Sequence, residues 1–231
     1  MSAWWTYDLR DLLMFSSQTY YRLFELYNIE WWPLQIVALA LGAVVMALRR
    51  RGGERAGRAI AGILAVCWLW VAWAFHWQRY ASINLVAGYF AWAFVVQALL
   101  LLWLGVVRGR LTPVPATTRL QQRVGLSLLL LALLLLPLMS PLLGRSWTQA
   151  EMFGMAPDPT ALATIGVLLF AGARPVWGLF PIPVAWCLIS GGTLWAMESP
   201  DFAVVPLASL LALILAVGGA LSDAGSGRSS G

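Results

Sequence analysis

The run VGLSLLLLALLLLPLMSPLL, residues 124–143, decides the class of this protein. It is 20 residues long and contains no charged side chain. About 20 apolar residues in an α-helix cross the roughly 30 Å of hydrocarbon in a lipid bilayer. Helices in soluble proteins average only about 10–14 residues. The run is therefore predicted to be a membrane-spanning helix, with lipid as its solvent.

The rest of the chain repeats this pattern. Hydrophobic residues make up 61% of the 231 residues and charged residues 11%, against about 45–50% and about 25% in soluble domains. So few charges cannot cover a water-facing surface of this size. We therefore predict an all-α fold, a polytopic transmembrane helix bundle of about seven spans. The spans are expected near residues 32–48, 59–77, 83–107, 124–143, 159–173, 175–197 and 202–221, within a bundle of residues 31–222.

The arginines predict the orientation of the bundle, because the cytoplasmic connections of membrane proteins are enriched in basic residues. With seven spans, eleven arginines fall on one side and four on the other. We expect a multi-pass protein of the bacterial inner (plasma) membrane, with its N-terminus outside and its C-terminus in the cytoplasm. The eleven are Arg49, Arg50, Arg51, Arg55, Arg58, Arg108, Arg110, Arg119, Arg123, Arg174 and Arg228, and the four are Arg10, Arg22, Arg79 and Arg145.

A rival arrangement has six spans. The fifth run is short, and only Arg174 and Pro175 separate it from the sixth, so it is also compatible with a re-entrant element. That arrangement would place Glu198 and Asp201 on the cytoplasmic side and the C-terminus outside. We favour seven spans because they give the greater asymmetry of arginines.

The two ends of the chain differ from the bundle. Residues 1–30 are predicted to form one or two amphipathic helices on the outer surface, and no cleavable signal peptide is expected there. Residues 223–231 are rich in glycine and serine and are predicted to be a disordered tail. The apolar positions at helical spacing near the N-terminus are Leu9, Leu12, Leu13, Tyr20, Leu23, Phe24 and Tyr27.

Several classes of protein are excluded by composition. All 15 basic residues are arginine, so neither a Schiff-base lysine nor a P-loop is possible. The net charge of +5 comes from arginines between apolar runs, which indicates membrane topology and not a nucleic-acid partner. We find no cofactor motif and no paired acid and base typical of an active site, and we expect a protein that is not an enzyme.

His76 is the only histidine, and it ends the second predicted span. Helical spacing places it on one face with Trp73, Trp77 and Tyr80. One interpretation is a proton-accepting or metal-binding histidine in an aromatic cavity. We favour the other, an aromatic belt at the membrane interface that includes a histidine. The identity of any metal is left open.

The outer loop before the fifth span is unusual, because it ends in Pro157-Asp158-Pro159. Asp158 is predicted to cap the following helix. The sharper hypothesis is that this helix start receives a cation from the periplasm, with Glu198 and Asp201 in the same outer layer. The candidate ligand-binding residues are His76, Tyr80, Asn84, Glu151, Asp158, Glu198 and Asp201.

Polar residues inside the spans are assigned to packing first and to a solute path second. In the sixth span Trp186, Ser190 and Thr193 form a stripe at helical spacing, and Gln97 lies in the third. Cys67 and Cys187 lie near the middle of their spans and are interpreted as small buried hydrophobic residues.

The segment Thr19–Trp32 (TYYRLFELYNIEWW), the span after it and the turn 154–160 resemble a bacterial family of small multi-span membrane proteins of unknown function. The resemblance covers most of the chain. Members of that family often carry Thr-Pro-Cys-Pro at the turn, where this chain has Ala156-Pro157-Asp158-Pro159, so the resemblance implies no thiol chemistry here. Some members are labelled permease-like.

These observations favour a permease-like protein that binds or admits a small cationic or polar solute from the extracytoplasmic side. The outer half holds the polar candidates, whereas the inner half is almost purely Leu, Val and Ala. The alternative is a non-catalytic membrane subunit or scaffold that docks a membrane protein partner through the N-terminal arm. The expected partners are the lipid bilayer, a small solute or cation, and a membrane protein or a second copy of the chain.

Overall fold

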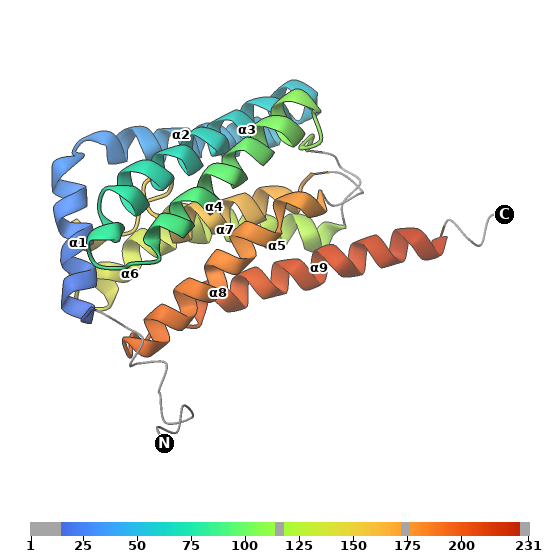
Figure 1. Cartoon of the computed structure of the whole chain (residues 1–231). Helices are drawn as coiled ribbons and strands as arrows, with labels where there is room; N and C mark the ends of the chain where they lie inside the picture. The colour runs from blue at the N-terminus through green and yellow to red at the C-terminus, as the bar shows by residue number, and fades with distance from the viewer. Residues whose placement is uncertain (1–14, 114–117, 172–175, 227–231) are drawn as a thin grey trace, which may run out of the picture.

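The computed structural model describes residues 15–113, 118–171 and 176–226, and these residues form helices joined by short connections (Figure 1). Within these ranges the fold is all-α, as predicted. The α-helices are α1 (Ser17–Glu30), α2 (Leu34–Arg51), α3 (Gly53–Trp70), α4 (Ala87–Leu100), α5 (Arg119–Leu130), α6 (Leu136–Leu142), α7 (Pro157–Leu168), α8 (Pro181–Ala196) and α9 (Val204–Ser226). The π-helical turns are η3 (Val71–Trp77), η5 (Leu101–Val107) and η6 (Leu131–Leu135), and the 3₁₀ turns are η4 (Tyr80–Ser82), η7 (Trp147–Gln149) and η8 (Trp177–Leu179).

Within the described ranges, five continuous helical segments are long and apolar enough to cross a membrane. The number rises to six if the pair α1 and α2, bent by 90°, is one broken span. The predicted fifth span does not reach this length, because α7 has 12 residues and rises only about 18 Å. The five are Gly53–Ser82, Ala87–Val107, Arg119–Leu142, Trp177–Ala196 and Val204–Leu221.

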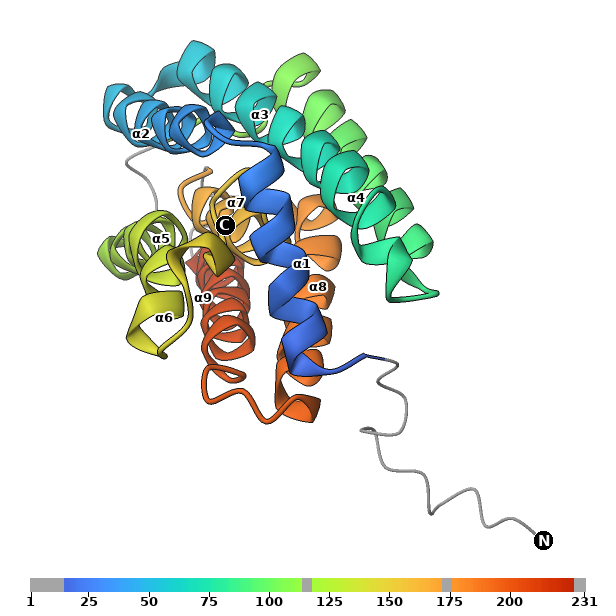
Figure 2. The same cartoon turned by 90° about the vertical axis from the view of Figure 1, so that its left-hand side faces the viewer.

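Helix α7 lies at the centre of the molecule, as the end-on view in Figure 2 shows. All 12 of its residues are buried, and a helix that is apolar all round is expected to be enclosed by others. It contacts α5, α8, η6, α9 and α3. The Trp68 indole N–H of α3 donates to the Thr164 hydroxyl of α7 at 2.8 Å, so one of its few polar groups is satisfied inside the bundle.

The loop before α7 enters the bundle. Gly154 lies against Cys67 of α3, and a Cβ at Gly154 would be 3.0 Å from the Cys67 sulfur. At the other end of α7, Ala171 forms a single bridge with Pro113, in the connection after η5. The segment from 157 to 171 therefore runs from the interior of the bundle to the end where Pro113 lies.

The rival six-span arrangement is wrong about the side on which Asp201 lies. It would separate Arg145 from Asp201 by the whole membrane, whereas an Arg145 guanidinium nitrogen lies 2.6 Å from an Asp201 carboxylate oxygen. Both residues therefore lie at the same end of the bundle. The predicted disordered tail also begins too early, because α9 continues to Ser226; residues 227–231 lie outside the described ranges.

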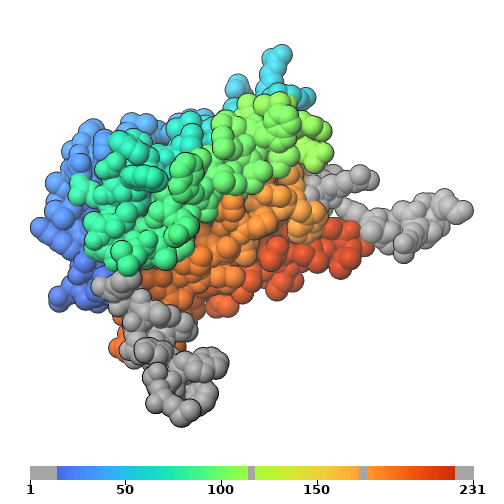
Figure 3. Space-filling view, viewed as in Figure 1, coloured from blue at the N-terminus to red at the C-terminus, as the bar shows by residue number. Residues whose placement is uncertain are grey.

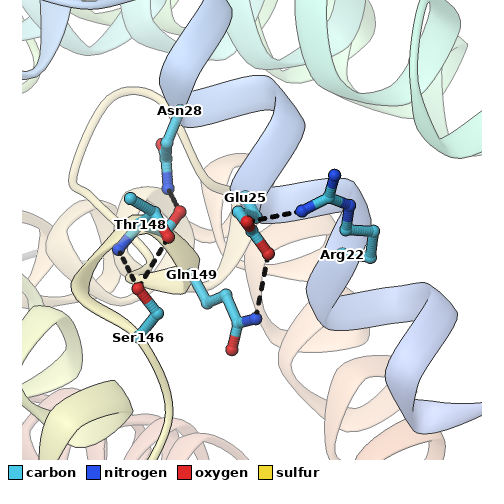
Figure 4. A network of polar contacts seen from close by, with 6 residues as sticks. All are labelled: Arg22, Glu25, Asn28, Ser146, Thr148 and Gln149. Atoms are coloured by element: carbon cyan, nitrogen blue, oxygen red, sulfur yellow. Dashed lines mark hydrogen bonds and ion pairs between the residues drawn. The ribbon is translucent and has the colours of Figure 1, made fainter.

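Helix α1 lies across one end of the bundle (Figures 1 and 2). Its buried residues recur at helical spacing, and Phe24 meets Phe75 of η3 with ring centroids 4.9 Å apart. Polar contacts also join α1 to the loop after α6 (Figure 4). Glu25, which accepts from Arg22 of the same helix, also accepts from Gln149, and the Asn28 amide donates to the Thr148 carbonyl. Residues 1–14 of the predicted N-terminal segment lie outside the described ranges.

Candidate functional site

Three carboxylates and one guanidinium surround a small cavity beside the start of α7. The cavity has a volume of about 20 Å³, which is room for about one water molecule. The bundle helices supply an apolar wall, and the charged groups come from α7 and from the loops at the end covered by α1. We call it the carboxylate pocket, lined by Leu136, Met139, Ser140, Arg145, Glu151, Asp158, Leu194, Asp201, Val204 and Val205.

Asp158 is the most enclosed acid, with only 2% of its surface exposed. The Trp186 indole N–H donates to one carboxylate oxygen at 2.7 Å, and the Ser190 hydroxyl donates to the other at 2.6 Å. These donors lie four residues apart on α8 and therefore share one face. Both oxygens of Asp158 are held by the neighbouring helix.

The predicted capping role of Asp158 is wrong. Helix α7 begins at Pro157, so Asp158 lies inside its first turn and the cap position is Ala156, which has no side-chain cap bond. Thr160 instead accepts a hydrogen bond from the Gly154 N–H at 3.0 Å. The start of α7 is buried, because the preceding loop carries it into the bundle.

Asp201 is linked to α1 through two bridges. Its carboxylate accepts from Arg145 at 2.6 Å and from the Ser199 hydroxyl. The Ser199 hydroxyl also forms a hydrogen bond with the Tyr21 hydroxyl of α1 at 2.9 Å, and the Arg145 guanidinium lies 4.3 Å from the centre of the Tyr21 ring. Tyr21 therefore contacts both of the residues that donate to Asp201.

Glu151, in the loop between η7 and α7, has the fewest hydrogen-bond donors among the three acids of the pocket. Among the described residues no hydrogen bond to its carboxylate is found. Burial raises its pKa well above the ordinary 4.5, and the negative charges of Asp158 and Asp201 raise it further, while Arg145 lowers it. Three acids facing one guanidinium make the pocket a place for a positive charge or a proton.

Replacing Glu151 by Gln is expected to make the folded protein more stable at neutral pH. A carboxyl whose pKa is raised by folding costs stability once the pH exceeds its unfolded value, so wild-type stability falls from about pH 4.5 upward until the raised folded pKa is passed. Thermal unfolding between pH 4 and pH 8 should show this slope in the wild type and a flatter profile in Glu151→Gln. If the unfolding temperatures of the two proteins change with pH in parallel, the prediction for Glu151 is wrong.

His76 is fully buried, and its ring centre lies 4.4 Å from that of Phe94 and 4.8 Å from that of Trp186. The predicted shared face is wrong, because Trp73 and Trp77 are exposed whereas His76 and Tyr80 point inward. The cause is the π-helical turn η3, whose wider turn changes the angular spacing of these residues.

The Trp186 indole separates His76 from the carboxylate pocket, since it contacts the His76 ring and donates to Asp158. His76 itself does not line the pocket. Its two ring nitrogens make no hydrogen bond within the described part of the chain. In that part, no three His, Cys, Asp or Glu residues are arranged to hold a metal ion.

The other predicted candidates lie outside the pocket. Asn84 accepts from the Val86 N–H at 2.9 Å at the start of α4, which is a local turn contact. Glu198 is exposed and adopts a left-handed backbone conformation, with φ of 58°, after α8. Thr193 donates to the Ile189 carbonyl of its own helix, and Gln97 donates to the Leu179 carbonyl at 3.2 Å. Gln97 thus contacts another segment, as the packing interpretation expects.

Sequence reasoning missed four polar residues of this region: Ser140, Arg145, Ser199 and Tyr21. The place of Arg145, six residues before Glu151 in a loop of mixed charge, is a signal in the sequence for this contact with acids. The contact between Tyr21 and Ser199 joins residues 178 positions apart, and no local sequence pattern predicts it.

The arrangement defines a class: an all-helical protein, with five or six helices apolar enough to span a membrane, that encloses a buried acidic pocket at one end. Residues 17–224 match a family described as a family of unknown function (DUF6064), and the chain belongs to it. No curated protein and no solved structure matches the chain.

Proposed function

We propose that this protein is a permease-like integral membrane protein that binds a small cationic or polar solute from the extracytoplasmic side. The observation that carries the proposal is the carboxylate pocket, in which Glu151, Asp158 and Asp201 face the single guanidinium of Arg145. Ionisable groups inside a membrane protein are costly and usually mark a functional site. The negative excess favours a cation over an anion.

We propose the inner membrane as its location and a seven-segment crossing in which α7 is a short, enclosed segment. Two observations support this orientation. Arg49, Arg50 and Arg51 end α2 at the end of the bundle away from the pocket, and the connection containing Arg108 and Arg110 lies at that same end. The positive-inside rule would make that end cytoplasmic and the pocket extracytoplasmic, with α1 at the outer interface.

The size of the pocket restricts the solute. A cavity of about 20 Å³ admits a particle no larger than water or ammonium unless it widens. The contacts of Tyr21 with Ser199 and Arg145 are the ones that a larger solute would have to break. The alternative role, a scaffold that docks a partner through the arm, has less support, because the apolar face of α1 is buried in the bundle.

The test is uptake by the purified full chain in liposomes. We expect ammonium to enter faster than in empty liposomes, and acetate to show no difference. Glu151→Gln should reduce the rate by roughly tenfold or more, equivalent to about 1.4 kcal/mol. Glu54→Gln is the matched control, because Glu54 is an exposed acid next to the other end of the bundle and pairs with Arg58.

A rate equal to that of empty liposomes for every cation, or equal rates for the two variants, would end the proposal. Because Glu151→Gln is expected to be more stable than the wild type at neutral pH, a loss of uptake in this variant cannot be attributed to unfolding.

A further inference from the structure

A second hollow, separate from the carboxylate pocket, lies between α1 and the turn that follows η3. It has a volume of about 380 Å³, within the range of sites for small molecules. In the space-filling view the blue surface of α1 lies against the blue-green surface of the neighbouring segment (Figure 3). We call it the arginine groove, lined by Gln18, Thr19, Arg22, Leu23, Leu26, Arg79, Ser82 and Ile83.

Two guanidinium groups line this groove, Arg22 from α1 and Arg79 from the turn. Arg22 pairs through one terminal nitrogen with Glu25 at 2.5 Å, and Arg79 pairs through one with Glu30. A guanidinium has five N–H donors in a planar fork, so one such contact leaves donors for a second acceptor. The two side chains are 59% and 31% exposed, which leaves them accessible from the groove.

The first turn of α1 adds to the preference for an anion. Gln18 and Thr19 belong to that turn, and it contains no acidic side chain. The Ser16 hydroxyl caps this turn by accepting from the Thr19 N–H at 3.2 Å, and the partial positive charge of a helix N-terminus still favours phosphate and other anions. Two guanidinium groups, each paired with one glutamate, and the first turn of α1 therefore meet in one hollow.

The surroundings of the groove are those of a membrane interface. Trp77, two residues before Arg79, is 53% exposed, and Trp32, just after α1, is 66% exposed. Exposed tryptophans are typical of the boundary between lipid and water. The groove also has an apolar side, where Leu26 is 43% exposed. A ligand with an anionic head and a hydrocarbon body would match both sides.

We propose that the arginine groove binds a phosphate-bearing anion, held by Arg22 and Arg79 in forked hydrogen bonds. Its amphipathic lining favours the phosphate of a phospholipid over inorganic phosphate from solution. Such binding would fix α1 to the lipid surface beside the carboxylate pocket. It is a separate site and does not depend on solute uptake.

The test uses the full chain in neutral detergent, with thermal unfolding followed during titration. Three probes distinguish the source of the phosphate: short-chain phosphatidylglycerol, the zwitterionic phosphatidylcholine of the same chain length, and inorganic phosphate. We expect saturable stabilisation by phosphatidylglycerol that weakens with added salt, because the attraction is partly screened. The double variant Arg22→Gln/Arg79→Gln should raise the apparent Kd roughly tenfold or more.

Two further variants separate binding from folding. Gln18→Glu keeps both arginines and places a negative charge in the first turn of α1, where acids stabilise the helix, yet it should weaken binding. Arg55→Gln removes an exposed arginine on α3 and should titrate like the wild type. Inorganic phosphate acting with the same variant pattern, and phosphatidylglycerol no better, would support the phosphate site and identify a soluble source. Groove variants that titrate like the wild type, or equal effects of the two lipids, would overturn the proposal.

Discussion

Asp158→Asn is expected to abolish solute uptake while leaving the fold intact. An asparagine has almost the same shape, and its carbonyl oxygen can still accept from the Trp186 indole, 2.7 Å from the carboxylate in the wild type. Its amide can donate to the Ser190 hydroxyl, which rotates to accept. Only the negative charge is lost. Loss of a buried charge opposite a cation costs about 3 kcal/mol, which corresponds to roughly a hundredfold weaker solute binding.

Asp158→Ala is the comparison variant, because it removes the hydrogen-bond acceptor together with the charge. It leaves the Trp186 N–H buried without an acceptor, and an unsatisfied buried donor costs about 1–3 kcal/mol. We therefore expect a lower unfolding temperature for Asp158→Ala and a nearly unchanged one for Asp158→Asn, with uptake lost in both. If Asp158→Asn transports like the wild type, the charge of Asp158 plays no part in solute binding. Uptake into liposomes and thermal unfolding in detergent measure the two effects.

The fold class followed from the sequence because apolar runs of 17 to 25 residues leave few alternatives. The run 124–143 corresponds to η6, α6 and most of α5 in the structure. The fifth run was harder, since hydropathy does not distinguish a helix that faces lipid from one that other helices enclose. The loop 143–156 makes the fifth run an enclosed helix, because it brings Gly154 into contact with Cys67 and so shortens the helix that follows.

The sequence predicts several residues of the candidate site but not which of them contact each other. The sequence indicates Asp158, Trp186 and Ser190 individually as candidates. Their pairing depends on two helices meeting at one depth, which spacing along the chain does not reveal. The inward turn of His76 depends on the π-helical turn η3, because a regular helix would have placed it beside the exposed Trp73. Local periodicity finds the residues, whereas tertiary packing decides which of them face each other.

Gly166→Ala is expected to destabilise the protein, although alanine is normally the better helix former by about 1 kcal/mol. A Cβ built at Gly166 lies 2.9 Å from the carbonyl oxygen of Gly125, and one built at Gly125 lies 2.8 Å from that of Gly166. The backbones of α5 and α7 thus touch at this point. Neither carbonyl can move without shifting its helix, so we expect a net loss of about 1–3 kcal/mol, as in other overpacked cores.

Gly192→Ala is the matched control, because Gly192 also lies inside a helix, α8, and a Cβ there meets nothing within 4 Å. It should leave the unfolding temperature unchanged or raise it, whereas Gly166→Ala should lower it. Equal shifts would show that α5 and α7 do not approach this closely. The same displacement of α7 should also disturb the pocket, because Asp158 lies at the other end of this short helix, and uptake should then fall in Gly166→Ala but not in Gly192→Ala.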